Sequence, residues 1–80
     1  MIPVSIYPNP ANQHLNIMLE VQPGMMAEVF DALGNRVGFH SLNSSQNLIS
    51  TSGLSGGMYH VQISDKGNQV VSRARFVVNR

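Results

Sequence analysis

The chain has 80 residues, of which 42% are hydrophobic and 11% are charged, and its net charge is +1. A chain of this length is expected to form one domain that buries only about 60–65% of the surface its unfolded state exposes. The lack of cysteine excludes disulfide bonds and thiolate chemistry, and one Lys with four Arg is too little positive charge for binding nucleic acid.

The first quarter of the chain predicts two strands around a proline-rich segment. Residues 4–7 form a short first strand, and residues 15–21 alternate apolar and polar side chains as a half-buried strand does. Between them, Pro8 and Pro10 fix their own φ angles and favour extended conformations at the residues before them. A stiff, extended lead-in is therefore expected, with the Asn9 amide able to bond to backbone.

The next two strands are predicted on either side of a tight turn. Residues 27–31 form the first of them, and Val37 and Phe39 are the apolar positions of the second. The turn has Asp31 at its start and Gly34 at its end, where a left-handed conformation closes a type I turn. The Asp31 carboxylate is expected to accept a hydrogen bond from the backbone two residues further on.

A polar loop and two further strands follow. Residues 43–47 are the loop, and residues 48–51 are a short strand. A glycine-rich turn with Leu54 as its apolar anchor leads into a strand at residues 59–64, in which Tyr59 can offer its ring to the core and its hydroxyl to the turn backbone.

The last predicted strand is the longest and spans residues 69–78. Its alternation places Val70, Ser72, Ala74, Phe76 and Val78 on one face, and Val71, Arg73, Arg75 and Val77 on the other. The basic residues of this part of the chain have two interpretations. In the first, which the composition favours, these charges protect an edge strand from aggregation. In the second, they bind an acidic or carbonyl-rich groove of a receptor.

These elements together predict an all-β fold. No helical stripe of about ten residues is present, and about seven short strands with turn signals every 8–12 residues are typical of a sandwich. Short connecting loops favour antiparallel pairing. The predicted fold is therefore a small Ig-like or Greek-key β-sandwich of about seven mostly antiparallel strands, with residues 1–80 forming a single domain.

The sequence offers little for catalysis or metal binding. His14, His40 and His60 fall in different strands and are interpreted as solvent-facing. No Ser occupies a Gly-x-Ser-x-Gly elbow, and Ser55 lies in a turn before a strand rather than before a helix. No catalytic residue, metal site or cofactor is predicted, and no apolar run approaches the roughly 20 residues of a membrane span.

Four motifs in chain order resemble one family. They are Tyr7-Pro8-Asn9-Pro10 before a strand, Asp31-x-x-Gly34 before a basic residue and Val, Leu54-x-x-Gly57-x-Tyr59 before an alternating strand, and the apolar terminal strand Phe76-Val77-Val78 that is followed by the basic Arg80. In this order they are similar to the C-terminal sorting domain of the type IX secretion system of Bacteroidota. The resemblance covers nearly the whole chain.

The resemblance implies a non-catalytic signal that directs a larger parent protein through the periplasm and across the outer membrane, for release or attachment at the cell surface. The implied partners are the secretion machinery and a sortase-like cysteine protease, whose cleavage site would lie just upstream of this segment. Because Met1 stands directly before Ile2 and Pro3, the chain is expected to be a fragment of such a parent.

Recognition is predicted at the last strand, from Phe76 to Arg80, which is expected to be accessible and able to add to a receptor sheet. The same edge, if unpaired, could join two copies into a homodimer. Two alternatives stay open. A fibronectin-like or Ig-like adhesion or spacer module of a surface protein would show an exposed aromatic platform, and a small hydrolase would need a nucleophile that the sequence does not offer.

Overall fold

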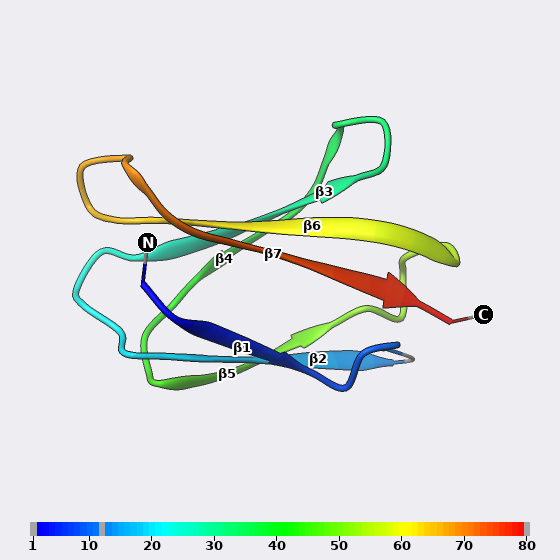
Figure 1. Ribbon diagram of the computed structural model, residues 1–80, viewed down its shortest axis with the longest axis horizontal. Coiled ribbons are helices and arrows are strands. Elements are labelled where there is room, and N and C mark those ends of the chain that lie inside the picture. Colours follow the sequence, from blue (N-terminus) through cyan, green and yellow to red (C-terminus); the bar gives the residue numbers. More distant parts are fainter. Residues whose placement is uncertain (1, 12, 80) are drawn as a thin grey trace.

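The computed structural model describes residues 2–11 and 13–79, and it consists of strands and turns (Figure 1). The strands are β1 (Val4–Tyr7), β2 (His14–Leu19), β3 (Met26–Asp31), β4 (Arg36–Ser41), β5 (Gln46–Ser50), β6 (Gly57–Ser64) and β7 (Val70–Val78). Every ladder between these strands is antiparallel. The prediction of an all-β sandwich with about seven mostly antiparallel strands is confirmed.

The strands form two sheets that face one another as two layers (Figure 1). The three-stranded sheet has the order β1-β2-β5, and the four-stranded sheet has the order β4-β3-β6-β7. The chain changes sheet between β2 and β3, between β4 and β5, and between β5 and β6. Strands that are consecutive in sequence are therefore often in different layers.

The core lies between the sheets and is built from the inward face of each strand. In β2, Leu15, Ile17 and Leu19 are buried, as the alternation of the sequence predicted. Among residues 2–11 and 13–79, the buried apolar side chains are Ala11, Leu15, Ile17, Leu19, Met25, Ala27, Val29, Leu42, Ile49, Tyr59, Val61, Ile63, Phe76 and Val78.

Strand β4 carries its apolar side chains on the outside. Val37 and Phe39 are 42% and 49% exposed, whereas His40 is half-buried and Leu42 is buried. Because side chains alternate along a strand, Leu42 in the core places His40 on the inward side of the sheet. The alternation in the sequence predicted the strand but not which of its faces is buried, and the interpretation of His40 as solvent-facing is wrong.

The segment between β1 and β2 is not the extended lead-in that its prolines predicted, because residues 8–10 are bends. Strands β1 and β2 are antiparallel neighbours, with Tyr7 opposite Asn16, so the chain must reverse between them. The peptide bonds before Pro8 and Pro10 are both cis. Tyr7, before Pro8, keeps the extended geometry of β1, as the preference of a residue before proline requires, and the chain turns at residues 8–10 so that β2 can pair with β1.

Strand β5 begins earlier than predicted, inside the expected polar loop. Gln46 pairs with Met18 and Asn47 pairs with Ile17 of β2, so both belong to the ladder despite their polar side chains. An edge strand tolerates polar residues because much of its surface faces water. The loop that the sequence predicted at residues 43–47 is therefore shorter in the structure.

Candidate recognition surfaces

The predicted motifs meet at one end of the sandwich, near the end of β7. Asp31 lies opposite Tyr59 across the β3–β6 ladder, and Tyr59 lies opposite Phe76 across the β6–β7 ladder. The rings of Tyr59 and Phe76 are stacked, with their centroids 5.5 Å apart. The proline-rich segment reaches the same end, because Ala11 forms a bridge with Val78. Motifs that are far apart in sequence therefore form one connected structural unit.

Tyr59 links the core of this unit to its neighbouring turn. Its side chain is buried, and its hydroxyl donates a hydrogen bond of 2.6 Å to the carbonyl of Ser55. Leu54 of the same turn packs against the core cluster, and Gly57 takes a positive φ of 149° at the start of β6. The predicted roles of Tyr59 and of Leu54 as an anchor are confirmed.

The terminal strand has one buried and one exposed face. Phe76 and Val78 are 1% and 2% exposed, whereas Val77 is 38% exposed and Arg75 is also exposed. From Ser72 to Val78 the two faces agree with the predicted alternation. Val71, predicted on the face of Arg73, packs instead against the core, beside a register shift in the β6–β7 ladder. The expectation that the whole apolar strand is accessible is wrong, because Phe76 and Val78 are side chains of the core. Arg80, the other residue of the predicted determinant, lies outside the described residues.

The outer edge of β7 is covered by residues 8–11. The side chain of Asn9 acts on this edge like a short strand: the amide of Val77 donates to its Oδ1 at 3.0 Å, and its Nδ2 donates to the carbonyl of Arg75 at 3.4 Å. The backbone of Ala11 continues the pairing. Its amide donates to the carbonyl of Val77 at 2.7 Å, and its carbonyl accepts from the amide of Asn79 at 2.9 Å.

The edge from Arg75 to Asn79 is therefore not unpaired, although the homodimer interpretation requires a free edge. Near the other end of β7, the amide of Ile2 also donates to the carbonyl of Val71, at 2.7 Å. The sequence did contain one signal, because the Asn9 amide was expected to bond to backbone. Its partner could not be predicted, since Asn9 and β7 are joined only by the tertiary fold. A homodimer through this edge has fewer free backbone groups with which to pair.

Asp31 organises the turn between β3 and β4. Its Oδ1 accepts hydrogen bonds from the amides of Leu33 and Asn35, at 3.0 and 2.9 Å. Its carbonyl accepts from the amide of Gly34, whose φ of 89° is the left-handed conformation that glycine adopts without a steric penalty. The predicted turn is confirmed. Several hydrogen bonds to the carboxylate hold the pKa of Asp31 below its ordinary value of 3.8. Among them, the bond from the backbone of Asn35 has the largest effect.

This lowered pKa predicts an acid-dependent loss of stability. Because the folded state favours the charged carboxylate, Asp31 contributes stability above about pH 4, and the contribution is lost as the pH falls toward the folded-state pKa. Asp31→Asn keeps an oxygen acceptor but cannot titrate. Urea unfolding between neutral pH and about pH 2 is expected to show a shallower decline in stability for Asp31→Asn than for the wild type. Identical pH profiles would contradict this role.

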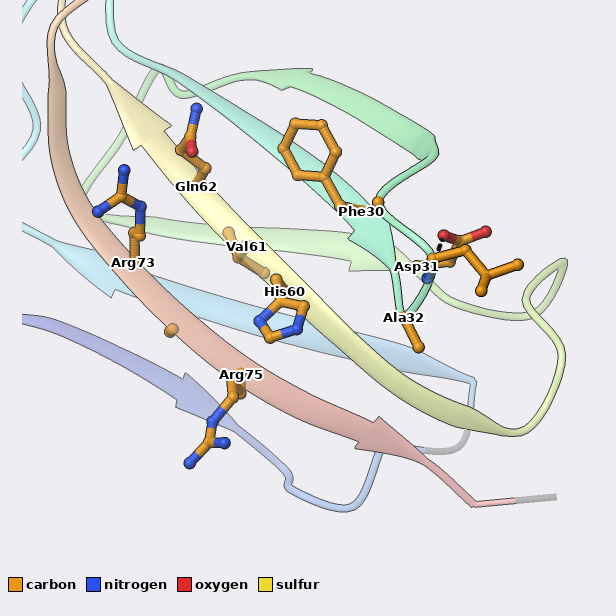
Figure 2. A pocket seen from close by; sticks show the side chains of 11 residues that line it. Phe30, Asp31, Ala32, His60, Val61, Gln62, Arg73 and Arg75 are labelled. Atoms are coloured by element: carbon orange, nitrogen blue, oxygen red, sulfur yellow. Dashed lines mark hydrogen bonds between the residues drawn. The ribbon is translucent and has the colours of Figure 1, made fainter.

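The outer face of the four-stranded sheet carries a shallow groove of about 760 Å³, called here the outer groove. Figure 2 shows that Arg73 and Arg75 of β7, His60 of β6 and Phe30 of β3 stand along it. The register explains this arrangement. Arg75 lies opposite His60, and His60 lies opposite Phe30. Cross-strand partners project to the same face of a sheet, so the three elements present these side chains together.

The exposed aromatic residues do not form one platform. Tyr7 is 40% exposed on β1 of the three-stranded sheet, where Gln46 Nε2 donates to its hydroxyl at 3.3 Å. Phe39 is 49% exposed on β4 of the four-stranded sheet, beneath the guanidinium of Arg36 at 5.3 Å. The two rings therefore lie in different layers of the sandwich.

Within residues 2–11 and 13–79, no three His, Cys, Asp or Glu side chains are grouped so that they could hold a metal ion. In the same part of the chain, no helix is long and apolar enough to span a bilayer.

Comparison with known proteins gives one match. The model of a family described as secretion system C-terminal sorting domain matches residues 5–79. That range contains β1 to β7 apart from the first residue of β1, and it includes all four sequence motifs except Arg80. Neither the curated proteins nor the solved structures that were compared with the chain match it.

Proposed function

The chain belongs to the family of type IX secretion C-terminal sorting domains, and from this membership we propose that it is the sorting signal of a secreted parent protein. It directs that parent from the periplasm across the outer membrane, to the cell surface or the medium. The observation that carries the proposal is the family match over residues 5–79. The gathering of the family motifs at one end of the sandwich supports it, because it gives another protein a single folded unit to bind.

The partners of this proposal are proteins rather than small molecules. The family is one of sorting signals, and the domain acts by being bound and not by catalysing a reaction. Its partners are the secretion machinery and a sortase-like cysteine protease at the outer membrane, for which the domain is part of the substrate. No cofactor takes part.

Within the domain, we place recognition at the end of β7. Val77 supports this placement, because its side chain points outward while its neighbours Phe76 and Val78 hold the core. A receptor that adds a strand to this edge needs the amide of Val77, which Asn9 now occupies. Recognition by strand addition therefore requires residues 8–11 to leave the edge first.

The test is the export of a reporter. A reporter with a signal peptide, fused in front of residues 1–80, is expected to reach the surface or medium of a Bacteroidota host that has the type IX system. In the same host without the machinery, the fusion is expected to stay in the periplasm. Removal of Val77 and all later residues should trap the reporter in the periplasm as well. Fractionation and protease accessibility measure each location.

The truncation also removes buried Val78, so it needs a folding control. Val78→Ala weakens the core but keeps the end of the chain, and it should be exported better than the truncated fusion if the end is recognised. Retention of the intact fusion in the periplasm of a competent host would refute the sorting function. Full surface display of the truncated fusion would refute recognition at β7 alone.

The alternative of an adhesion or spacer module gains no support from the exposed aromatics. Sugar-binding sandwiches of that kind would present a shared aromatic platform, whereas Tyr7 and Phe39 lie on different sheets. The sorting function therefore remains the one proposal.

A further inference from the structure

The outer groove has an excess of positive charge that the domain does not neutralise. Among residues 2–11 and 13–79 there is one ion pair, in which Arg36 Nη1 lies 3.1 Å from Glu28 Oε2. Arg36 is also stacked over Phe39, so its guanidinium has partners on two sides. Arg73 and Arg75 have no carboxylate partner in that part of the chain, although both are exposed on β7, on the outer face of the same sheet.

The acidic residues of the domain are engaged or lie elsewhere. Glu28 holds Arg36. Asp31 lines the outer groove and offsets one of its two arginine charges, but its oxygens accept hydrogen bonds from the turn and form no ion pair with either arginine. Glu20 and Asp65 line a different hollow, together with Ile2 and Met25. The charge of Arg73 and Arg75 is therefore available to an external anion, and His60 beside Arg75 adds a further hydrogen-bond donor.

Apolar surface adjoins this charge. Phe30 is half-buried and lines the outer groove, and Leu33 of the adjoining turn also lines it and is 88% exposed. An apolar side chain left this open in a small domain has no role in the core, and it gains by contact with another apolar group. A guanidinium binds a carboxylate with two parallel hydrogen bonds. The outer groove thus combines the two features that recognise a carboxylate next to an apolar side chain.

We propose that the outer groove docks an extended protein segment in which acidic and apolar residues alternate, with Arg73 and Arg75 binding its carboxylates and Phe30 and Leu33 contacting its apolar side chains. This inference rests on the proposed sorting function and assigns the segment to the secretion machinery. A charged polysaccharide would satisfy the arginines but would leave the apolar contacts of Leu33 unused. The chemistry therefore favours a peptide.

The experiment measures binding of a synthetic peptide with alternating Glu and Leu to the 80-residue domain, by titration calorimetry. Its matched controls are the same peptide with Gln in place of Glu, and with Ser in place of Leu. Arg73→Gln combined with Arg75→Gln is expected to weaken binding by about tenfold or more, since two charge-assisted contacts are lost. Leu33→Ser is expected to weaken it by about threefold to tenfold.

Arg36→Gln is the matched protein control. It removes an exposed arginine from the same face of the sheet, but the charge of this arginine is already neutralised by Glu28. Its binding should stay within about twofold of the wild type. Equal binding by the double variant and the wild type would overturn the proposal. Binding of polygalacturonate as tight as that of the Glu–Leu peptide, with no effect of Leu33→Ser, would overturn the choice of a peptide.

The reporter fusion separates this proposal from the sorting function. Export of the wild-type fusion with reduced export of the double arginine variant supports both. Export of the two fusions to the same extent overturns the docking role and leaves the sorting function standing. Failure of the wild-type fusion to be exported in a competent host overturns the sorting function, whatever the peptide titration shows.

Discussion

Replacement of Phe76 with alanine is expected to lower the free energy of unfolding by about 3–5 kcal/mol. The ring is 1% exposed and stacked on Tyr59, so its removal leaves a cavity between the sheets and takes away an aromatic contact. A domain of this size, without disulfides, has a core that supplies only about 3–5 kcal/mol of net stability. The variant should therefore be largely unfolded even without denaturant.

Circular dichroism and urea unfolding measure this effect. Val77→Thr is the matched control, because it changes the adjacent residue, keeps a β-branched side chain and affects the exposed face. Its stability should lie within about 0.5 kcal/mol of the wild type. If Phe76→Ala unfolded cooperatively with a loss below about 1 kcal/mol, the assignment of Phe76 to the centre of the core would be contradicted.

The result bears on the sorting function as well. A loss of export caused by a change at Phe76 can follow from unfolding, since this residue holds both β6 and the terminal strand in place. Changes at Val77 report on recognition more directly, because that side chain contributes little to the core. Export experiments on β7 should therefore be compared at equal stability.

Replacement of Asn9 with alanine is expected to release the edge of β7. The side chain makes two bonds to this edge, at 3.0 and 3.4 Å, so its loss should lower the free energy of unfolding by about 1–2 kcal/mol. The local effect should be clearer than the global one. The amide of Val77 loses its acceptor, and its hydrogen exchange in the native state is expected to accelerate by about tenfold or more.

Hydrogen exchange followed by NMR measures the rate at Val77 and at Asn79, whose amide bonds to Ala11. Asn16→Ala is the control, because Asn16 also donates to a backbone carbonyl, that of Tyr7 at 3.4 Å, but on the other sheet. This control should leave the exchange of the Val77 amide unchanged. Unchanged exchange at Val77 in the Asn9→Ala variant would show that residues 8–11 do not protect this edge.

Much of the candidate site followed from short-range chemistry. The turn at Asp31 was predictable because it needs only two local features. A carboxylate accepts from the amide two residues further on, and a glycine ends the turn with a positive φ. Tyr59 was predictable because it shares a strand face with the apolar Val61 and Ile63, and because its hydroxyl bonds to backbone only four residues away. The outer groove was not predicted, since its residues come from three strands and from the turn after β3.

The sequence by itself determined the strands and turns, because the alternation of side chains along a strand and the φ preference of glycine act over a few residues. It also determined which side chains of β2 form the core and how those of β7 divide between two faces, whereas the burial of Phe76 and Val78 came from the tertiary structure. The tertiary structure decided the buried face of β4 and the occupation of the β7 edge by Asn9. It also brought Arg73, Arg75 and Phe30 together in the outer groove. Each of these depends on which strands pair and on how the sheets stack, and such contacts join residues that no local preference relates.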